Sequence, residues 1–249
     1  MTSTTIGLQI FNFLVLSIMI DENLAAAFGM PELTIISHHS ITPELAEKCY
    51  HMGETTYYAD SAVDLQTYKN KFNAVPDFCF VFMHKELNEP VGYFIILPLN
   101  DDAIKRYMKN ELSFDTIQPG DLQRLKPNSL YNLFFDTKAV VKQYRTPEMA
   151  KMFFSLLIDA MVYRAKNFTL CNYILIDAYK EFSKTLAEVL ETKLLTTHKY
   201  TNGFESELYG SIFNYKNFQG SPNYTVLDFA YSNDQAVEIL QGQKDLWAE

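Results

Sequence analysis

The chain has few cysteines and an excess of negative charge. Its three cysteines, Cys49, Cys79 and Cys171, are widely spaced and odd in number. This pattern argues against a disulfide framework or a zinc motif and indicates a reducing compartment, the cytoplasm. The 21 lysines and arginines face 30 acidic residues, for a net charge of −9. Nucleic acids and anionic membranes need a basic surface, so neither is expected as the main partner, and a cationic partner suits the chain better.

One apolar run, residues 6–20, is too short for an ordinary membrane span, which needs roughly 20 residues. It also lacks the basic start of a secretory signal, and Asp21 and Glu22 follow it directly. We expect residues 1–30 to form an N-terminal extension, a helix that packs on the domain or in a homodimer interface. A targeting segment is the alternative.

The rest of the composition is that of a globular protein with a sizeable core. Hydrophobic residues make up 48% of the 249 residues and charged residues 20%, which suits one large domain or two small ones. Phenylalanine and tyrosine are abundant, at 19 and 16, and indicate a well-filled interior. We find no internal repeat.

The clearest pattern lies in residues 130–164. Aromatic and β-branched residues predict a strand in its first part, and helix spacing in its last part is set by Met149, Met152, Phe153, Leu156, Leu157, Ala160 and Met161. Thr146 suits a helix N-cap, Pro147 the first helical position and Glu148 the first turn. A strand that leads directly into a helix leaves main-chain N–H groups without partners, and these can bind an anion. An ordinary strand-turn-helix is the alternative.

The segment from Val140 to Ala150 resembles the acetyl-CoA-binding motif of the GNAT superfamily of N-acetyltransferases. In that family a strand precedes a Q/R-x-x-G-x-G/A loop and a long helix. Arg145 stands at the Gln/Arg position and Ala150 at the second Gly/Ala position, but Glu148 replaces the first glycine. Glutamate adds a Cβ and a negative charge where glycine lets the backbone approach a pyrophosphate. The resemblance implies the GNAT acyl-CoA N-acyltransferase fold over residues 31–213: an α/β fold with a mixed, mostly antiparallel central sheet flanked by helices.

The same resemblance implies an acetyl-CoA-dependent N-acetyltransferase that moves an acetyl group to a primary amine, either a small molecule or a protein. It places main-chain groups of Val140 and Val141 at the thioester and Arg145 at the pyrophosphate, with Lys142 nearby. The other cofactor contacts that it implies are Thr146, Glu148, Met149, Ala150, Lys151 and Ser183. A non-catalytic GNAT-fold interaction protein, with the apolar N-terminus as its partner surface, is the alternative function.

Three residues are catalytic candidates. Asp136 matches a carboxylate often found on this strand in the family, and Asn132 shares its strand face because side chains alternate, so both could reach the acceptor amine directly or through water. The tyrosine that commonly serves as general acid has no match at its usual helical position, so Tyr179 is the candidate. For Asp136, a strand-end carboxylate bonded to nearby backbone is the alternative.

Tyr57, Tyr58 and Asp60 lie in a polar and aromatic stretch, residues 53–64. In the family this region helps to form the acceptor pocket, where aromatic faces and carboxylates could bind a cationic amine. A surface loop is the alternative.

Periodicity and turn residues predict the remaining elements. We expect strands at 33–37, 78–84, 90–97, 172–178, 194–200 and 204–213, and helices at 43–52, 101–109 and 181–191. Residues 214–249 should form a C-terminal extension with another strand at 224–231 and a short helix within 236–247.

Overall fold

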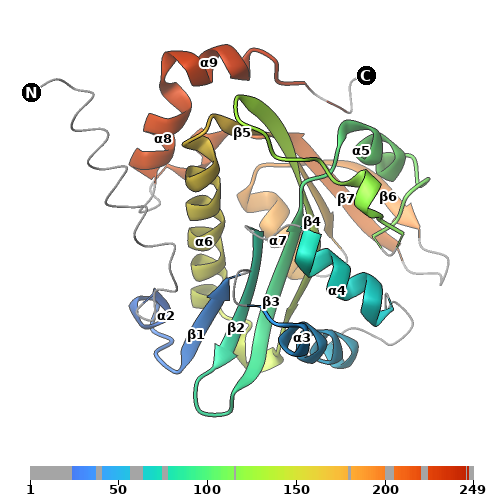
Figure 1. Cartoon of the computed structure of the whole chain (residues 1–249), viewed down its shortest axis with the longest axis vertical. Coiled ribbons are helices and arrows are strands. Elements are labelled where there is room, and N and C mark those ends of the chain that lie inside the picture. The colour runs from blue at the N-terminus through green and yellow to red at the C-terminus, as the bar shows by residue number, and fades with distance from the viewer. Residues whose placement is uncertain are drawn as a thin grey trace, which may run out of the picture.

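A computed structural model describes residues 24–37, 41–56, 64–74, 78–114, 116–178, 181–199, 205–219, 224–244 and 246. Figure 1 shows a twisted central sheet with helices packed around it. The strands are β1 Leu33–Ser37, β2 Cys79–His84, β3 Glu89–Leu97, β4 Ser129–Val140, β5 Thr169–Ala178, β6 Lys193–Lys199 and β7 Glu205–Ile212. The helices are α2 Leu24–Ala27, α3 Pro43–Thr56, α4 Leu65–Ala74, α5 Asp101–Met108, α6 Pro147–Ala165, α7 Glu181–Val189, α8 Tyr224–Ser232 and α9 Asp234–Leu240.

The seven strands form one sheet in the order β1-β2-β3-β4-β5-β7-β6. Only the β4–β5 pair is parallel, and α6 makes the crossover between these two strands. The other neighbouring pairs are antiparallel. The expected mixed, mostly antiparallel sheet is therefore confirmed.

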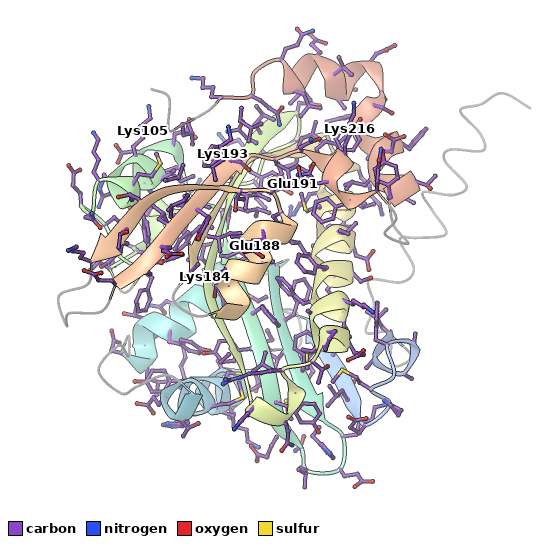
Figure 2. All side chains as sticks on the ribbon, turned by 180° about the vertical axis from the view of Figure 1, so that it is seen from behind. Lys105, Lys184, Glu188, Glu191, Lys193 and Lys216 are labelled. Carbon is purple, nitrogen blue, oxygen red and sulfur yellow. The ribbon has the colours of Figure 1, made fainter. Side chains whose placement is uncertain are left out.

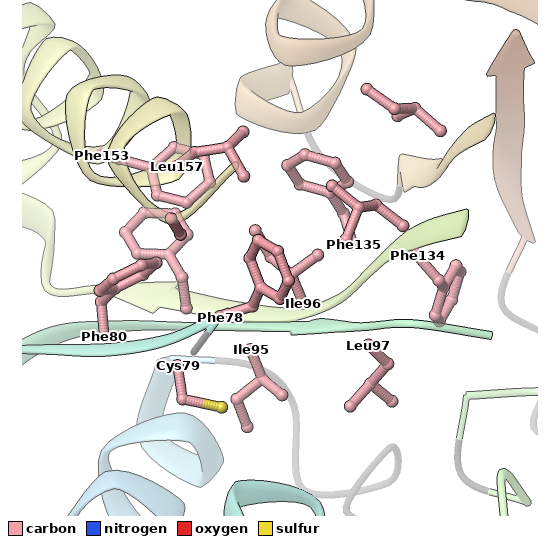
Figure 3. Close-up of a cluster of buried hydrophobic side chains, with 14 of the residues drawn as sticks. Phe78, Cys79, Phe80, Ile95, Ile96, Leu97, Phe134, Phe135, Phe153 and Leu157 are labelled. Carbon is pink, nitrogen blue, oxygen red and sulfur yellow. The ribbon is translucent and has the colours of Figure 1, made fainter. Parts of the chain in front are cut away.

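Apolar side chains fill both sides of the sheet. Figure 3 shows Phe153 and Leu157 of α6 over one face and Cys79, Ile95 and Leu97 on the opposite side of the strands. The Phe153 ring stacks on Phe94, with ring centroids 3.9 Å apart. These contacts fix α6 against the centre of the sheet, so its N-terminus is held beside the end of β4.

Helix α3 continues past its predicted end near residue 52, through Gly53 to Thr56. Glycine suits this helix position because a Cβ there would lie 2.6 Å from the Tyr93 hydroxyl oxygen, so the tyrosine would have to shift. The sequence pattern treated Gly53 as the start of a loop, and it also missed α4.

The strand predicted at residues 224–231 is wrong, because this segment is helix α8. Leu227, Ala230 and Tyr231 are its buried residues, and their spacing of three and four is that of one helix face. The short helix predicted after it is present as α9, although it begins earlier and ends earlier than expected.

Of the helical extension predicted at residues 1–30, residues 1–23 lie outside the described residues, and helix α2 is the helical part that the structure describes. No helix in the described part of the chain combines the length and the apolar character needed to cross a membrane.

Candidate functional site

Strands β4 and β5 pair along only part of their length. Their parallel ladder runs from Ser129–Thr169 to Phe135–Ile176 and then stops. Beyond that point β4 continues to Val140 paired with β3, while β5 pairs with β7. The two central strands therefore diverge at their carboxyl ends.

A β-bulge lies at the same place. Ile95 pairs with Thr137 and Ile96 with Phe135, so Asp136 is the extra residue in β4. The bulge interrupts the alternation that was expected to put positions 132 and 136 on one strand face. The Asp136 side chain lies outside the described part of the structure, and its catalytic role stays a prediction.

The main chain at the end of β4 is oriented by its pairing with β3. The Val141 N–H donates to the Val91 carbonyl at 2.9 Å. In an antiparallel pair alternate residues direct their main-chain groups to the partner strand, so those of Val140 point away from β3, to the side from which β5 has diverged. Of the two predicted main-chain donors, Val140 is thus the one whose N–H faces this side, and the N–H of Val141 is used within the sheet.

Arg145 is tied to the same strand end. Its Nε donates to the Val140 carbonyl oxygen at 2.8 Å, which brings the exposed guanidinium back over the turn. The side chains of Lys142 and Lys151 are also exposed at this turn. Three cations therefore surround the start of α6, as expected for a site that would hold a diphosphate.

The predicted start of α6 is confirmed. Thr146 is the N-cap, its Oγ1 accepts from the Met149 N–H at 3.3 Å, and Pro147 follows it as the first helical residue. The Thr146 N–H donates to the Tyr144 carbonyl at 2.9 Å, and the Ala150 N–H donates to the Thr146 carbonyl at 3.2 Å.

The Glu148 side chain is exposed at the same helix start. Hydrogen bonds from its own main-chain N–H and from the Thr146 side chain lower the pKa of the Glu148 carboxyl, and the charge of Lys151 adds to the effect. Of the N–H groups at this helix start, those of Thr146, Met149 and Ala150 are bonded within the chain and Pro147 has none, so fewer of them are open to an anion than the sequence predicted. The Glu148 carboxylate places a negative charge at this helix start, where an anion would otherwise bind.

Helix α3 starts with the same residues and has the same arrangement. The Thr42 Oγ1 accepts from the Leu45 N–H at 3.2 Å. Hydrogen bonds from its own N–H and from Thr42 lower the pKa of the Glu44 carboxyl. Ordinary helix capping by a Thr-Pro-Glu sequence thus accounts for the Glu148 conformation.

Asn132 is enclosed within the fold, with only 1% of its surface exposed. Its Nδ2 donates to the Leu99 carbonyl at 3.1 Å and to Asp101 Oδ1 at 2.8 Å. Its Oδ1 accepts from Asn172 Nδ2 at 2.8 Å. These bonds join β4 to β5 and to the start of α5. The geometry therefore indicates a structural role for Asn132 and does not include the predicted contact with an acceptor amine.

Of the other predicted site residues, Ser183 lies in the described part of the chain. Ser183 is buried in the first turn of α7, 5% exposed. The predicted general acid and the acceptor-loop residues lie outside the described residues, and their roles stay predictions: Tyr179, Tyr57, Tyr58 and Asp60.

A polar cluster that the sequence reasoning missed lies near the end of β5. The Tyr107 hydroxyl of α5 donates to Asp177 Oδ2 at 2.5 Å. The His198 ring of β6 stacks on Tyr107, with centroids 4.6 Å apart and planes at 10°, and its Nε2 lies 3.2 Å from the Leu112 carbonyl oxygen. The available signal was a carboxylate at the end of an otherwise apolar strand, Asn172–Ala178.

Neither a family model nor the sequence of a curated protein matches this chain. Among solved structures, the chain is similar to the GNAT-like decarboxylase GphF in complex with isobutyryl-CoA, with a TM-score of 0.50 at 9% identity over 72% of this chain and 99% of that one. Naa50 of Arabidopsis thaliana with a bisubstrate analogue has a TM-score of 0.49 at 9% identity, covering 73% and 99%. NAA60 of the same plant with acetyl-CoA has a TM-score of 0.48 at 15% identity, covering 73% and 99%.

The first of these similarities and the sheet topology agree. The chain has the α/β GNAT acyltransferase fold, as the motif around Arg145 predicted.

Proposed function

We propose that the protein binds acetyl-CoA between the diverging ends of β4 and β5 and transfers the acetyl group to a primary amine of a small molecule or a protein. One observation carries the proposal: the β4–β5 ladder ends at Phe135–Ile176, while β4 continues to Val140 with main-chain groups that face the diverging side. The GNAT-like decarboxylase of the same fold is in complex with isobutyryl-CoA, which supports a CoA thioester as the ligand.

The residues around the end of β4 suit a thioester with a polyanionic tail. The Val140 N–H can donate to the carbonyl oxygen of a thioester and polarise it for attack. Arg145, Lys142 and Lys151 supply positive charge for a diphosphate. Bound acetyl-CoA would supply the activated acetyl group, and the chain would hold it and orient it.

Glu148 favours a second candidate, a GNAT-fold interaction protein without transferase activity. Its carboxylate lies on the helix start where an anion would bind, as the pKa of this group indicates. If the carboxylate stays there, the protein has the shape of the enzyme but not its cofactor site.

Titration calorimetry with acetyl-CoA separates the two candidates, and Glu148→Gly sharpens the test. Replacing Glu148 by glycine removes a negative charge from the helix start and leaves its main-chain N–H open to the ligand. We therefore expect acetyl-CoA to bind Glu148→Gly at least about threefold more tightly than the wild type. Glu44→Gly is the matched control, because it removes the equivalent carboxylate from α3 and should leave acetyl-CoA affinity unchanged.

Transfer is then measured as thiol release from acetyl-CoA in the presence of tyramine, spermidine or a short peptide with a free N-terminus. Amine-dependent thiol release supports the transferase. If neither the wild type nor Glu148→Gly binds millimolar acetyl-CoA, the transferase proposal is refuted and the interaction protein remains.

A further inference from the structure

Asp177 occupies a distinctive position at the divergence of the two central strands. The last β4–β5 pair is Phe135–Ile176, so Asp177 is the first residue of β5 beyond the ladder. It pairs with Leu208 of β7 on its other side. A carboxylate at this position adjoins the space in which the proposed function places the thioester.

The Asp177 side chain lies on the face of the sheet opposite α6. Adjacent residues Phe134 and Phe135 point to opposite faces: the Phe134 ring lies 4.7 Å from Tyr107, and the Phe135 ring lies 6.2 Å from Phe153 of α6. Because Asp177 is bonded to Tyr107, it shares the Phe134 face. Helices α3 and α4 pack against β3.

The carboxylate is held by a rigid arrangement of rings. Tyr107 is fully buried, and its ring contacts both Phe134 and the stacked His198. His198 is 1% exposed, and as the Nε2–H tautomer it donates to the Leu112 carbonyl. Tyr107 and Leu112 both come from the segment between β3 and β4, so this segment sets the orientation of Asp177.

On the basis of the proposed function, we propose that Asp177 binds the acceptor ammonium and takes its proton, and that Tyr107 is a positioning residue for this carboxylate. The acceptor arrives as R–NH₃⁺, and one proton passes from its nitrogen to Asp177. The neutral nitrogen forms a bond to the thioester carbon, the C–S bond breaks, and its electron pair leaves with sulfur. A second proton from nitrogen goes to the thiolate, and Asp177 returns its proton to water. The products are the N-acetylated amine, the CoA thiol and one proton.

Asp177→Asn tests the assignment, since asparagine keeps an oxygen that can accept from Tyr107 but cannot take a proton. We expect kcat for the three probe amines to fall by about 100-fold or more, with the Kd for acetyl-CoA within about twofold of the wild type. A readout without turnover is calorimetric titration of tyramine into protein saturated with CoA, where Asp177→Asn should weaken tyramine binding at least about tenfold.

Tyr107→Phe keeps the stacked ring and removes only the hydroxyl. A positioning role predicts that kcat falls about tenfold while the KM for acetyl-CoA and the Tm stay near those of the wild type. A merely structural role predicts a lower Tm with kcat unchanged in the folded protein.

The matched control is Glu207→Gln on β7. Glu207 also accepts from a tyrosine, Tyr209, at 2.6 Å, and it pairs with Lys184 at 2.9 Å. Lys184 belongs to α7 (Figure 2), so this second tyrosine–carboxylate pair lies on the other face of the sheet. Glu207→Gln should leave kcat and tyramine binding unchanged.

The outcomes distinguish this inference from the proposed function. If acetyl-CoA binds and Asp177→Asn keeps kcat and tyramine affinity within about threefold of the wild type, the role of Asp177 is refuted and the transferase stands. If acetyl-CoA binds but no probe amine binds or reacts, the role of Asp177 is refuted as well. If acetyl-CoA does not bind, the proposed function fails and the role of Asp177 fails with it.

Discussion

Replacing Asn132 by alanine should destabilise the fold. The change removes three hydrogen bonds and leaves two buried partners unsatisfied, the Leu99 carbonyl and Asn172 Nδ2. Each unsatisfied buried group costs about 1–3 kcal/mol, so the free energy of unfolding should fall by about 3 kcal/mol. The third partner, Asp101, is exposed and can bond to water, so it adds little.

For a chain of this size, about 3 kcal/mol corresponds to a decrease in Tm of roughly 6–12 °C. Urea unfolding followed by circular dichroism, together with scanning calorimetry, measures both quantities. Asn70→Ala is the control, because Asn70 is exposed on α4 and, among the described residues, bonds only to Gln66 four residues away, so its loss should change stability by less than about 0.5 kcal/mol. If Asn132→Ala is as stable as the control but loses acetyl transfer, the structural role is refuted and the catalytic prediction is right.

Further predictions concern buried groups elsewhere in the fold. Tyr231→Phe should lower the free energy of unfolding by about 1–3 kcal/mol, because the buried Cys171 N–H loses its hydroxyl acceptor at 3.0 Å. Tyr131→Phe should be neutral, because the buried Tyr131 hydroxyl has no hydrogen-bond partner among the described residues. Parallel urea titrations compare the two variants. Burial raises the pKa of Asp159 to about 7 from 3.8, so stability should decrease as pH rises from about 4 to 7. Asp159→Asn should remove that decrease and stabilise the protein at pH 8 by up to about 4 kcal/mol, less to the extent that solvent screens the partly exposed side chain. The free energy of unfolding is measured across this pH range for both proteins. The same pH dependence in the wild type and the variant would contradict the reasoning. Gly210→Ala should destabilise by about 1–3 kcal/mol, because a Cβ would lie 2.8 Å from a leucine methyl carbon, and an unchanged Tm would refute this.

The sequence predicted most of the fold because its local signals agree with its tertiary structure. The cap at Thr146, the proline after it and the apolar spacing of α6 specify the same helix, and β1 has the predicted bounds. The segment 224–231 could not be assigned in this way, since its apolar residues satisfy both a period of two and one helix face. Only packing against the rest of the fold selects the helix.

The site was less predictable, because its geometry depends on contacts between distant segments. The motif correctly located the turn at Arg145, but a sequence pattern does not show whether the Glu148 side chain lies over the helix start or in solvent. The link between Tyr107 and Asp177 spans 70 positions, and local periodicity carries no information about such a contact. Asn132 was assigned to chemistry because a polar residue inside an apolar strand has two explanations, a reactive group or a buried hydrogen-bonding partner, and sequence alone does not separate them.

The central claim is that acetyl-CoA binds at the main chain of β4 where β5 has diverged. Protein labelled with ¹⁵N-valine tests it directly, because Val140 and Val141 are adjacent but only the Val141 N–H is bonded within the sheet, to Val91. We predict that titration with acetyl-CoA moves the Val140 amide resonance strongly and the Val141 resonance much less. Unchanged Val140 at millimolar acetyl-CoA, or shifts confined to valines far from this strand end, would contradict the account.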